Sequence, residues 1–78
     1  MTKESILSTI ANTVLDVTGI APELVTMEAT FEKLDIDSLY MVTIFVELEK
    51  AYEINLDNMG QVKTVVELVD YIFEELHG

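Results

Sequence analysis

Two stretches of the chain repeat apolar residues at the spacing of an amphipathic helix. In residues 3–17 the apolar side chains recur every three or four positions, at Ile6, Leu7, Ile10, Val14 and Val17. From Thr64 towards the end of the chain the same spacing returns, at Val65, Leu68, Val69, Ile72, Phe73 and Leu76. Thr64 followed by Glu67 is a capping box, which predicts that the last helix begins there.

Residues 38–52 predict a further helix with two apolar faces. One face holds Met41, Ile44, Phe45, Leu48 and Tyr52. The second face lies roughly 120–140° away by the 3.6-residue period and holds Leu39, Val42 and Val46. We expect the first face to pack in the core. The second is either covered by a loop or exposed as a stripe on which partners dock.

The connections differ in length. Gly19 and Pro22 break the first helical pattern, so residues 18–37 should form a long loop that wraps the core. Its apolar residues should pin it: Ile20, Leu24, Val25, Phe31 and Leu34. Residues 55–63 should form a second loop with at most one helical turn. The predicted fold is all-α: a single domain over residues 1–78, built as a three- to four-helix bundle with a short third helix.

Composition narrows the class of protein. Apolar residues make up 50% of the 78, yet no run approaches the ~18 residues that span a membrane. The N-terminus lacks the pattern of a signal peptide, and there is no cysteine for disulfides or thiolate metal sites. A cytoplasmic monomer is the expectation.

Charge indicates the kind of partner. Four lysines against fifteen acids give a net charge of −11, which repels nucleic acid and anionic lipid. The same surface attracts proteins with basic patches. The alternative is that acidity only keeps a small protein soluble.

Catalytic and metal-binding patterns are missing from the sequence. His77, the only histidine, lies next to the C-terminus, far along the chain from any nucleophile. Glu32, Asp35 and Asp37 do not have the spacing of an EF-hand calcium loop. We therefore predict that the protein is not an enzyme and holds no dedicated metal ion.

Ser38 is the strongest candidate for chemistry. It follows Asp37 at the predicted start of the second helix, where Asp37 or Ser38 would be the N-cap. A serine here has an exposed hydroxyl beside an acidic platform and an apolar stripe. It is either an ordinary helix-capping residue or a place where another enzyme attaches a group.

Residues 31–39, Phe-Glu-Lys-Leu-Asp-Ile-Asp-Ser-Leu, resemble the Phe-x-x-Leu-Gly-x-Asp-Ser-Leu motif of acyl carrier proteins. The resemblance extends over essentially the whole chain, through Val42, Leu48, Glu49, Tyr52, Glu53, Ile54, Thr64, Val65 and Leu68. It implies a carrier that holds an acyl group as a thioester on 4′-phosphopantetheine. A phosphopantetheinyl transferase would attach this arm from coenzyme A to Ser38, flanked by Asp37 and Leu39. The chemistry would then lie in the prosthetic group.

The resemblance also implies docking of acyl-transferring and condensing enzymes with basic patches. The residues expected to contact them are Asp35, Leu39, Tyr40, Val42, Val46, Glu47 and Glu49. An acyl chain would fold back between helices, with the candidate lining Ile44, Phe45, Leu48, Val62, Leu68 and Ile72. An aminoacyl or peptidyl carrier, or an unmodified acidic binding module, are the alternatives.

Some positions depart from the family pattern. Asp35 replaces the glycine of the motif, and Tyr40 and Thr43 stand where carriers of fatty-acid synthesis usually have acids. Lys50 adds a positive charge to the same helix, and the segment around Gly60 looks about two residues short. These differences favour a specialised pathway, such as type II polyketide or other secondary-metabolite synthesis, over housekeeping fatty-acid synthesis.

Overall fold

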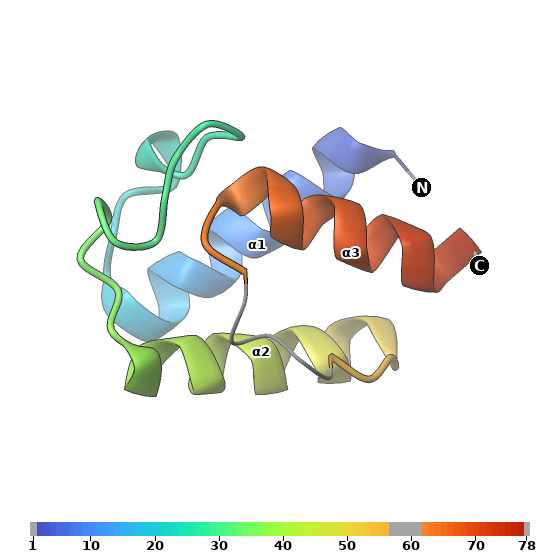
Figure 1. Ribbon diagram of the computed structural model, residues 1–78. Helices are drawn as coiled ribbons and strands as arrows, with labels where there is room; N and C mark the ends of the chain where they lie inside the picture. The colour runs from blue at the N-terminus through green and yellow to red at the C-terminus, as the bar shows by residue number, and fades with distance from the viewer. Residues whose placement is uncertain (1, 57–61, 78) are drawn as a thin grey trace.

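The described part of the chain forms three α-helices and one short 3₁₀ turn (Figure 1). We describe a computed structural model, which places residues 2–56 and 62–77. Helix α1 spans Lys3–Thr18, the 3₁₀ turn η1 spans Pro22–Leu24, α2 spans Ser38–Tyr52 and α3 spans Val65–His77. Within these residues there is no strand, and none of the helices has the length and apolar character needed to cross a bilayer. The fold is the predicted all-α bundle.

Local sequence signals define both ends of α1. Thr2 is the N-cap: its side chain accepts a hydrogen bond from the Ser5 backbone N–H, and the Ser5 side chain accepts one from the Thr2 N–H. These reciprocal bonds satisfy two donors that a helix start otherwise leaves free. At the other end, Gly19 has φ +82° and donates its N–H to the Leu15 carbonyl at 2.8 Å. Glycine ends the helix here because this left-handed conformation is costly for other residues.

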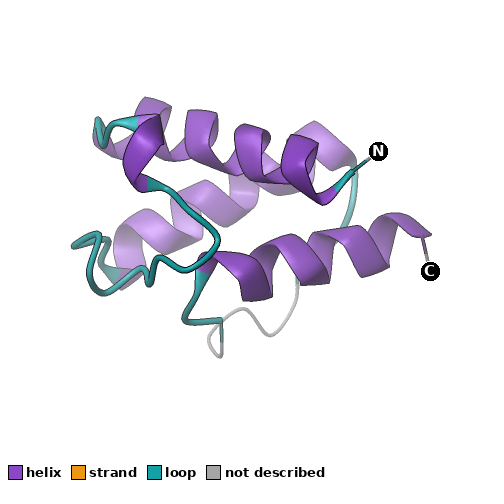
Figure 2. Ribbon diagram, turned by 90° about the horizontal axis from the view of Figure 1, so that it is seen from above, coloured by secondary structure: helices purple, strands orange, loops and turns teal. Residues whose placement is uncertain are grey.

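Helix α1 packs against both α2 and α3. Figures 1 and 2 show the three helices arranged around a shared interior, with the long loop of residues 19–37 closing one end. The core is apolar and drawn from all three helices and the loops: Ile6, Ile10, Ala11, Val14, Val25, Phe31, Ile36, Ile44, Leu48, Leu56, Val65, Leu68, Val69 and Ile72. The predicted core faces of the helices are therefore confirmed.

Backbone hydrogen bonds fasten the long loop to the start of α3. Thr30 forms an isolated bridge with Thr64, and the Phe31 N–H donates to the Lys63 carbonyl at 3.0 Å. The N–H groups of Val65 and Val66 donate to carbonyls of the loop, those of residues 29 and 27. We call this set of bonds the clasp. It holds the segment before α2 against α3, so the loop is ordered.

The structure corrects one detail of the loop prediction. Val25 and Phe31 are buried and pin the loop as expected, but Leu24 is 59% exposed. Leu24 ends the 3₁₀ turn, which directs its side chain to the surface. The short third helix is expected within residues 55–63, and residues 57–61 of this range lie outside the described residues. Residues 55, 56, 62 and 63 are not helical.

Candidate functional site

Ser38 is the first residue of α2, and Asp37 is its N-cap. The Asp37 Oδ1 atom accepts a hydrogen bond from the Tyr40 N–H at 3.0 Å, and the Asp37 carbonyl accepts one from the Met41 N–H. Of the two N-caps that the sequence left open, the structure selects Asp37. Ser38 is exposed, and among the described residues its hydroxyl makes no hydrogen bond. The side chain is therefore accessible for attachment of a group.

A tight turn of the backbone directly precedes Asp37. The Ile36 N–H donates to the Phe31 carbonyl, and the Asp35 N–H donates to the Glu32 carbonyl, both at 3.0 Å. This pair of bonds is a Schellman motif, which requires a left-handed residue at the position of Asp35. Asp35 has φ +62°. The carrier motif has glycine at this position, and the backbone conformation explains why: glycine adopts it without steric cost.

The second apolar face of α2 is exposed. Leu39, Val42 and Val46 are 76%, 59% and 41% exposed, so the loop does not cover them. On the opposite side of the helix, Ile44 and Leu48 are fully buried. We call Leu39, Val42 and Val46 the α2 stripe; it begins next to Ser38.

The other residues predicted to dock partners differ in their exposure. Asp35 and Glu47 are exposed, and Tyr40 is 44% exposed. Glu49 differs, because it is half-buried and its Oε2 atom accepts a hydrogen bond from the Leu56 N–H at 2.8 Å. Glu49 thus ties the chain after α2 back to the helix, a role the sequence did not indicate. Contact of these residues with partners stays a prediction.

A pocket of about 570 Å³ lies beside the start of α2. Its lining comes from the loop before α2, the first turns of α2 and the segment before α3: Thr30, Phe31, Glu32, Lys33, Ile36, Met41, Val62 and Lys63. We call it the loop pocket. Sequence reasoning missed it because the clasp, a set of backbone bonds, brings two of its walls together.

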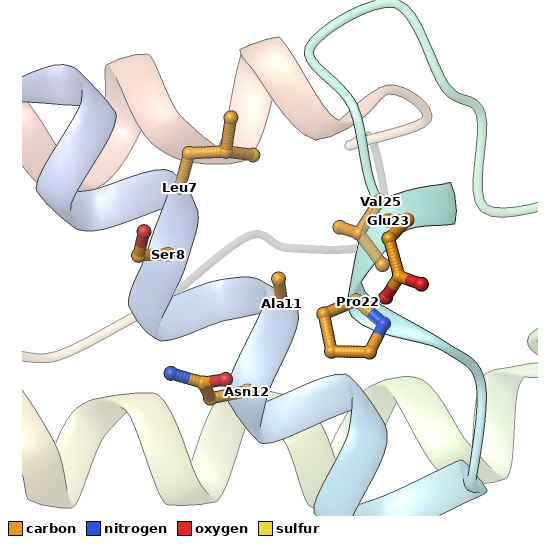
Figure 3. Close-up of a pocket in the computed structure, with 7 residues that line it drawn as sticks. All are labelled: Leu7, Ser8, Ala11, Asn12, Pro22, Glu23 and Val25. Atoms are coloured by element: carbon orange, nitrogen blue, oxygen red, sulfur yellow. The ribbon is translucent and has the colours of Figure 1, made fainter.

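Two other pockets lie elsewhere. One, of about 310 Å³, lies between α1 and the 3₁₀ turn, where Ala11 faces Pro22 and Val25 (Figure 3). The other, of about 380 Å³, is lined by residues of α1 and α2, among them Asp16 and Glu47. Neither is lined by residues of the segment 30–38.

The expected lining for a folded-back acyl chain is mostly closed core. Ile44, Leu48, Leu68 and Ile72 are all fully buried. Val62 alone of the expected set also lines the loop pocket. The opening that the structure presents beside Ser38 is therefore the loop pocket.

A second cap orders the wall of this pocket that precedes α3. Glu67 Oε1 accepts hydrogen bonds from the N–H groups of Lys63 and Thr64, each at 2.9 Å, and the Glu67 N–H donates to Thr64 Oγ1 at 3.2 Å. The predicted capping box is confirmed. The backbone N–H of Lys63, then that of Thr64 and the Thr64 hydroxyl, lower the pKa of Glu67 from its ordinary value because they stabilise the carboxylate.

The local chemistry suits a phosphate ester on Ser38. The hydroxyl is exposed, and the adjacent N-terminus of α2 favours negative charge through its free N–H groups and dipole. The Asp37 carboxylate works against a second anion, but its hydrogen bond with the Tyr40 N–H spreads its charge. Phosphopantetheine, when bound, supplies a thiol at the end of a long arm, and this chain has no cysteine of its own.

Comparison with known proteins identifies the family. The family model described as "Phosphopantetheine attachment site" matches residues 8–72. The chain is 40% identical over 75 residues to the meromycolate extension acyl carrier protein of Mycobacterium leprae, covering 92% of this chain and 65% of that protein. It thus spans just under two thirds of that relative. It is 32% identical over 68 residues to the acyl carrier protein of Lactococcus lactis, covering 87% of this chain and 93% of the other.

Structural comparison agrees on the fold. A crystal structure of an acyl carrier protein from Thermotoga maritima superposes with a TM-score of 0.87, covering 96% of this chain and 91% of the other at 18% identity. Acyl carrier proteins are carriers and not enzymes, and the matched domain holds 4′-phosphopantetheine covalently. The matched residues include the whole of the site at the start of α2. This chain belongs to the acyl carrier protein family.

Proposed function

We propose that Ser38 is the attachment site of 4′-phosphopantetheine and that the arm carries an acyl group as a thioester to partner enzymes. The observation that carries this proposal is the exposed Ser38 hydroxyl, which has no hydrogen-bond partner among the described residues and directly follows the N-cap Asp37. A transferase would join the Ser38 oxygen to the phosphate of coenzyme A. The adenosine bisphosphate part would leave, and the hydroxyl proton would pass to the transferase or to water.

The α2 stripe supports the docking part of the proposal. Its three apolar side chains are exposed beside the attachment site, and the acids Asp35, before α2, and Glu47, within α2, are exposed as well. An apolar centre with a charged rim is the usual anatomy of a protein interface. Weak contacts of this kind suit a monomeric carrier that must leave each enzyme in turn.

The pathway is a narrower proposal. The departures at Tyr40, Thr43 and Lys50 favour a specialised acyl pathway, such as polyketide or other secondary-metabolite synthesis. Similarity to carriers named for meromycolate extension supports elongation of an acyl chain as a second candidate. An aminoacyl or peptidyl cargo is the alternative, and loading tests with purified cargo enzymes separate these classes.

The test is intact-protein mass spectrometry after incubation with coenzyme A, magnesium and a broad-specificity phosphopantetheinyl transferase. We expect the parent chain to gain one phosphopantetheine and the Ser38→Ala variant to gain none. Alanine at this first helical position should change the free energy of unfolding by less than about 0.5 kcal/mol, because it removes only an exposed hydroxyl. Loading of a correctly folded Ser38→Ala variant would disprove the site, and an unmodified parent would favour the unmodified binding module.

The same reaction tests docking if its rate is measured. Val42→Ser removes apolar surface from the α2 stripe, and we expect slower loading by the transferase. Leu15→Ser is the matched control, since Leu15 is 40% exposed on α1, away from the stripe. Equal rates for the two variants would show that the stripe does not contact the transferase.

A further inference from the structure

The loop pocket differs in charge from the rest of the molecule. Of the four lysines in this acidic chain, Lys33 and Lys63 both line it, with Glu32 as the one acid in its lining. The pocket between α1 and the 3₁₀ turn contains only Glu23 as a charged residue, and the third pocket contains two acids. The loop pocket is therefore the one of the three whose lining is net positive.

Neither of these two lysines forms a close ion pair among the described residues, where the close ion pair found is that of Lys3 with Asp70. Lys63 interacts with the Glu67 carboxylate at longer range and contributes to the lowered pKa of Glu67. In a chain with fifteen acids, two cations without a close carboxylate on one pocket leave a local preference for an anion.

Apart from Thr30, the remaining lining is apolar. Phe31 and Ile36 are buried, and Met41 and Val62 are partly buried against the core. A pocket of about 570 Å³ falls within the size range of small-molecule sites, which combine an apolar wall with a few polar groups. An aliphatic chain that ends in a negative charge matches this combination.

The pocket lies within reach of a group attached to Ser38. Ile36 and Met41, which line it, precede and follow Ser38 by two and three residues, and three residues of α-helix rise only about 4.5 Å. Ser38 itself, with Asp37 and Leu39, is not part of the lining. A phosphate bonded directly to Ser38 would therefore lie outside, and the far end of the arm would be the part that enters.

We propose that the loop pocket binds acyl cargo that carries a free carboxylate, with Lys33 and Lys63 holding the carboxylate and the apolar wall contacting the chain. This inference rests on the proposed function, since it requires the arm on Ser38. The pocket should bind acidic acyl groups in preference to neutral acyl groups of the same length.

The test compares two loaded forms that differ in one terminal group. The transferase loads the protein from succinyl-coenzyme A or butyryl-coenzyme A, and mass spectrometry verifies each product. Hydroxylamine then cleaves the thioester, giving the hydroxamate and the free thiol of the arm. An exposed ion pair contributes about 0.2–1 kcal/mol, which corresponds to a factor of about 1.4 to 5. Binding of the carboxylate should therefore slow cleavage of the succinyl form by this factor relative to the rate for the same form when unfolded. The butyryl form should show no such protection.

Two-dimensional NMR of the same samples supplies the location. We expect the backbone amide signals of residues 30–33 and 63 to differ between the succinyl and butyryl forms. The Lys33→Met/Lys63→Met double variant should lose both the protection and the signal differences. Lys50→Met is the control for loss of a lysine elsewhere: it removes one positive charge, against two in the double variant, from an exposed residue of α2 outside the pocket, and it should behave as the parent.

The outcomes separate this inference from the proposed function. Failure to load any arm on Ser38 removes both. Normal loading with equal protection and equal spectra for succinyl and butyryl forms overturns the acidic-cargo inference alone. Amide signals that shift on attachment of the bare arm, with no further change on succinylation, would assign the lysines to the phosphate and overturn the inference in the same way.

Discussion

Among residues 2–56 and 62–77, two residues other than glycine adopt the left-handed backbone conformation, Asp35 with φ +62° and Glu53 with φ +55°. Asp35 ends a turn and Glu53 ends α2, each with the 6→1 hydrogen bond of a Schellman motif: the Ile54 N–H donates to the Glu49 carbonyl just as the Ile36 N–H donates to that of Phe31. Aspartate tolerates this conformation better than glutamate does, because its short polar side chain can interact locally with the backbone. The strain is therefore concentrated at Glu53.

Replacement of Glu53 by glycine should stabilise the protein. The left-handed conformation costs a residue with a Cβ atom about 1–2 kcal/mol. Glycine removes that cost but raises the conformational entropy of the unfolded chain, which offsets about 0.4–1 kcal/mol of the gain. We expect the free energy of unfolding to rise by about 0.5–1 kcal/mol, measured by urea denaturation. Glu53→Ala is the control, since it removes the same charge and keeps the Cβ atom. A glycine variant no more stable than the alanine variant would contradict the backbone explanation.

At the scale of elements, the helices follow from the sequence and the clasp does not. The helical spacing of apolar residues predicts α1, α2 and α3 to within about one residue at each predicted boundary, and the buried faces agree. The bridge between Thr30 and Thr64 is formed by backbone atoms, so no pattern of side chains in the sequence predicts it. The loop pocket depends on that bridge, which is why the sequence predicted Ser38 and missed the pocket beside it.

The sequence predicted the exposure of the α2 stripe only in part. The sequence separated Leu39, Val42 and Val46 from the core face of α2 but left two possibilities, cover by the loop or exposure. The path of the loop decides between them: its buried residues Val25 and Phe31 fasten it to the core, and the stripe remains open.

The cap on α3 should make the clasp sensitive to acid. The folded-state pKa of Glu67 is lowered, so its stabilising contribution is complete above the ordinary value of 4.5 and is lost as the pH falls through the lower folded-state pKa. We expect Glu67→Gln to be less stable than the parent at pH 7, and the difference to shrink as the pH drops below about 4.5. Urea midpoints measured between neutral and acidic pH test this.

The control for Glu67→Gln is Glu74→Gln, an exposed glutamate on the same helix. It removes the same charge and has no hydrogen bond to the clasp among the described residues. A stability difference for Glu67→Gln that stays constant at all pH values would show that its carboxylate contributes no charge-dependent stabilisation to the cap.

At the scale of the whole molecule, repulsion among the acids is the main electrostatic feature, and few ion pairs oppose it in the part of the chain that the structure describes. The Lys3–Asp70 bridge, at 2.9 Å, joins α1 to α3, and Lys3 also lies 5.2 Å from the centre of the Phe73 ring. Both side chains of the bridge are about half exposed, which limits its contribution to less than about 1 kcal/mol. The remaining acids are spread over a body only 31 Å in its longest dimension.

The melting temperature should therefore rise with salt. Charges interact over about 30 Å at 0.01 M ionic strength and about 10 Å at 0.1 M. The first distance spans the whole molecule, and the second is close to its radius of gyration of 11.1 Å. Added salt therefore removes repulsion between opposite sides of the folded protein. The unfolded chain is stabilised less by salt, because unfolding already separates its charges. Circular dichroism would measure the melting temperature of the parent and of a variant with Glu23, Glu74 and Glu75 replaced by glutamine. We expect the variant to have a higher melting temperature at low salt and a smaller rise on addition of salt. A melting temperature that falls between these ionic strengths would mean that attractive pairs, and not the net charge of −11, dominate the electrostatics of the fold.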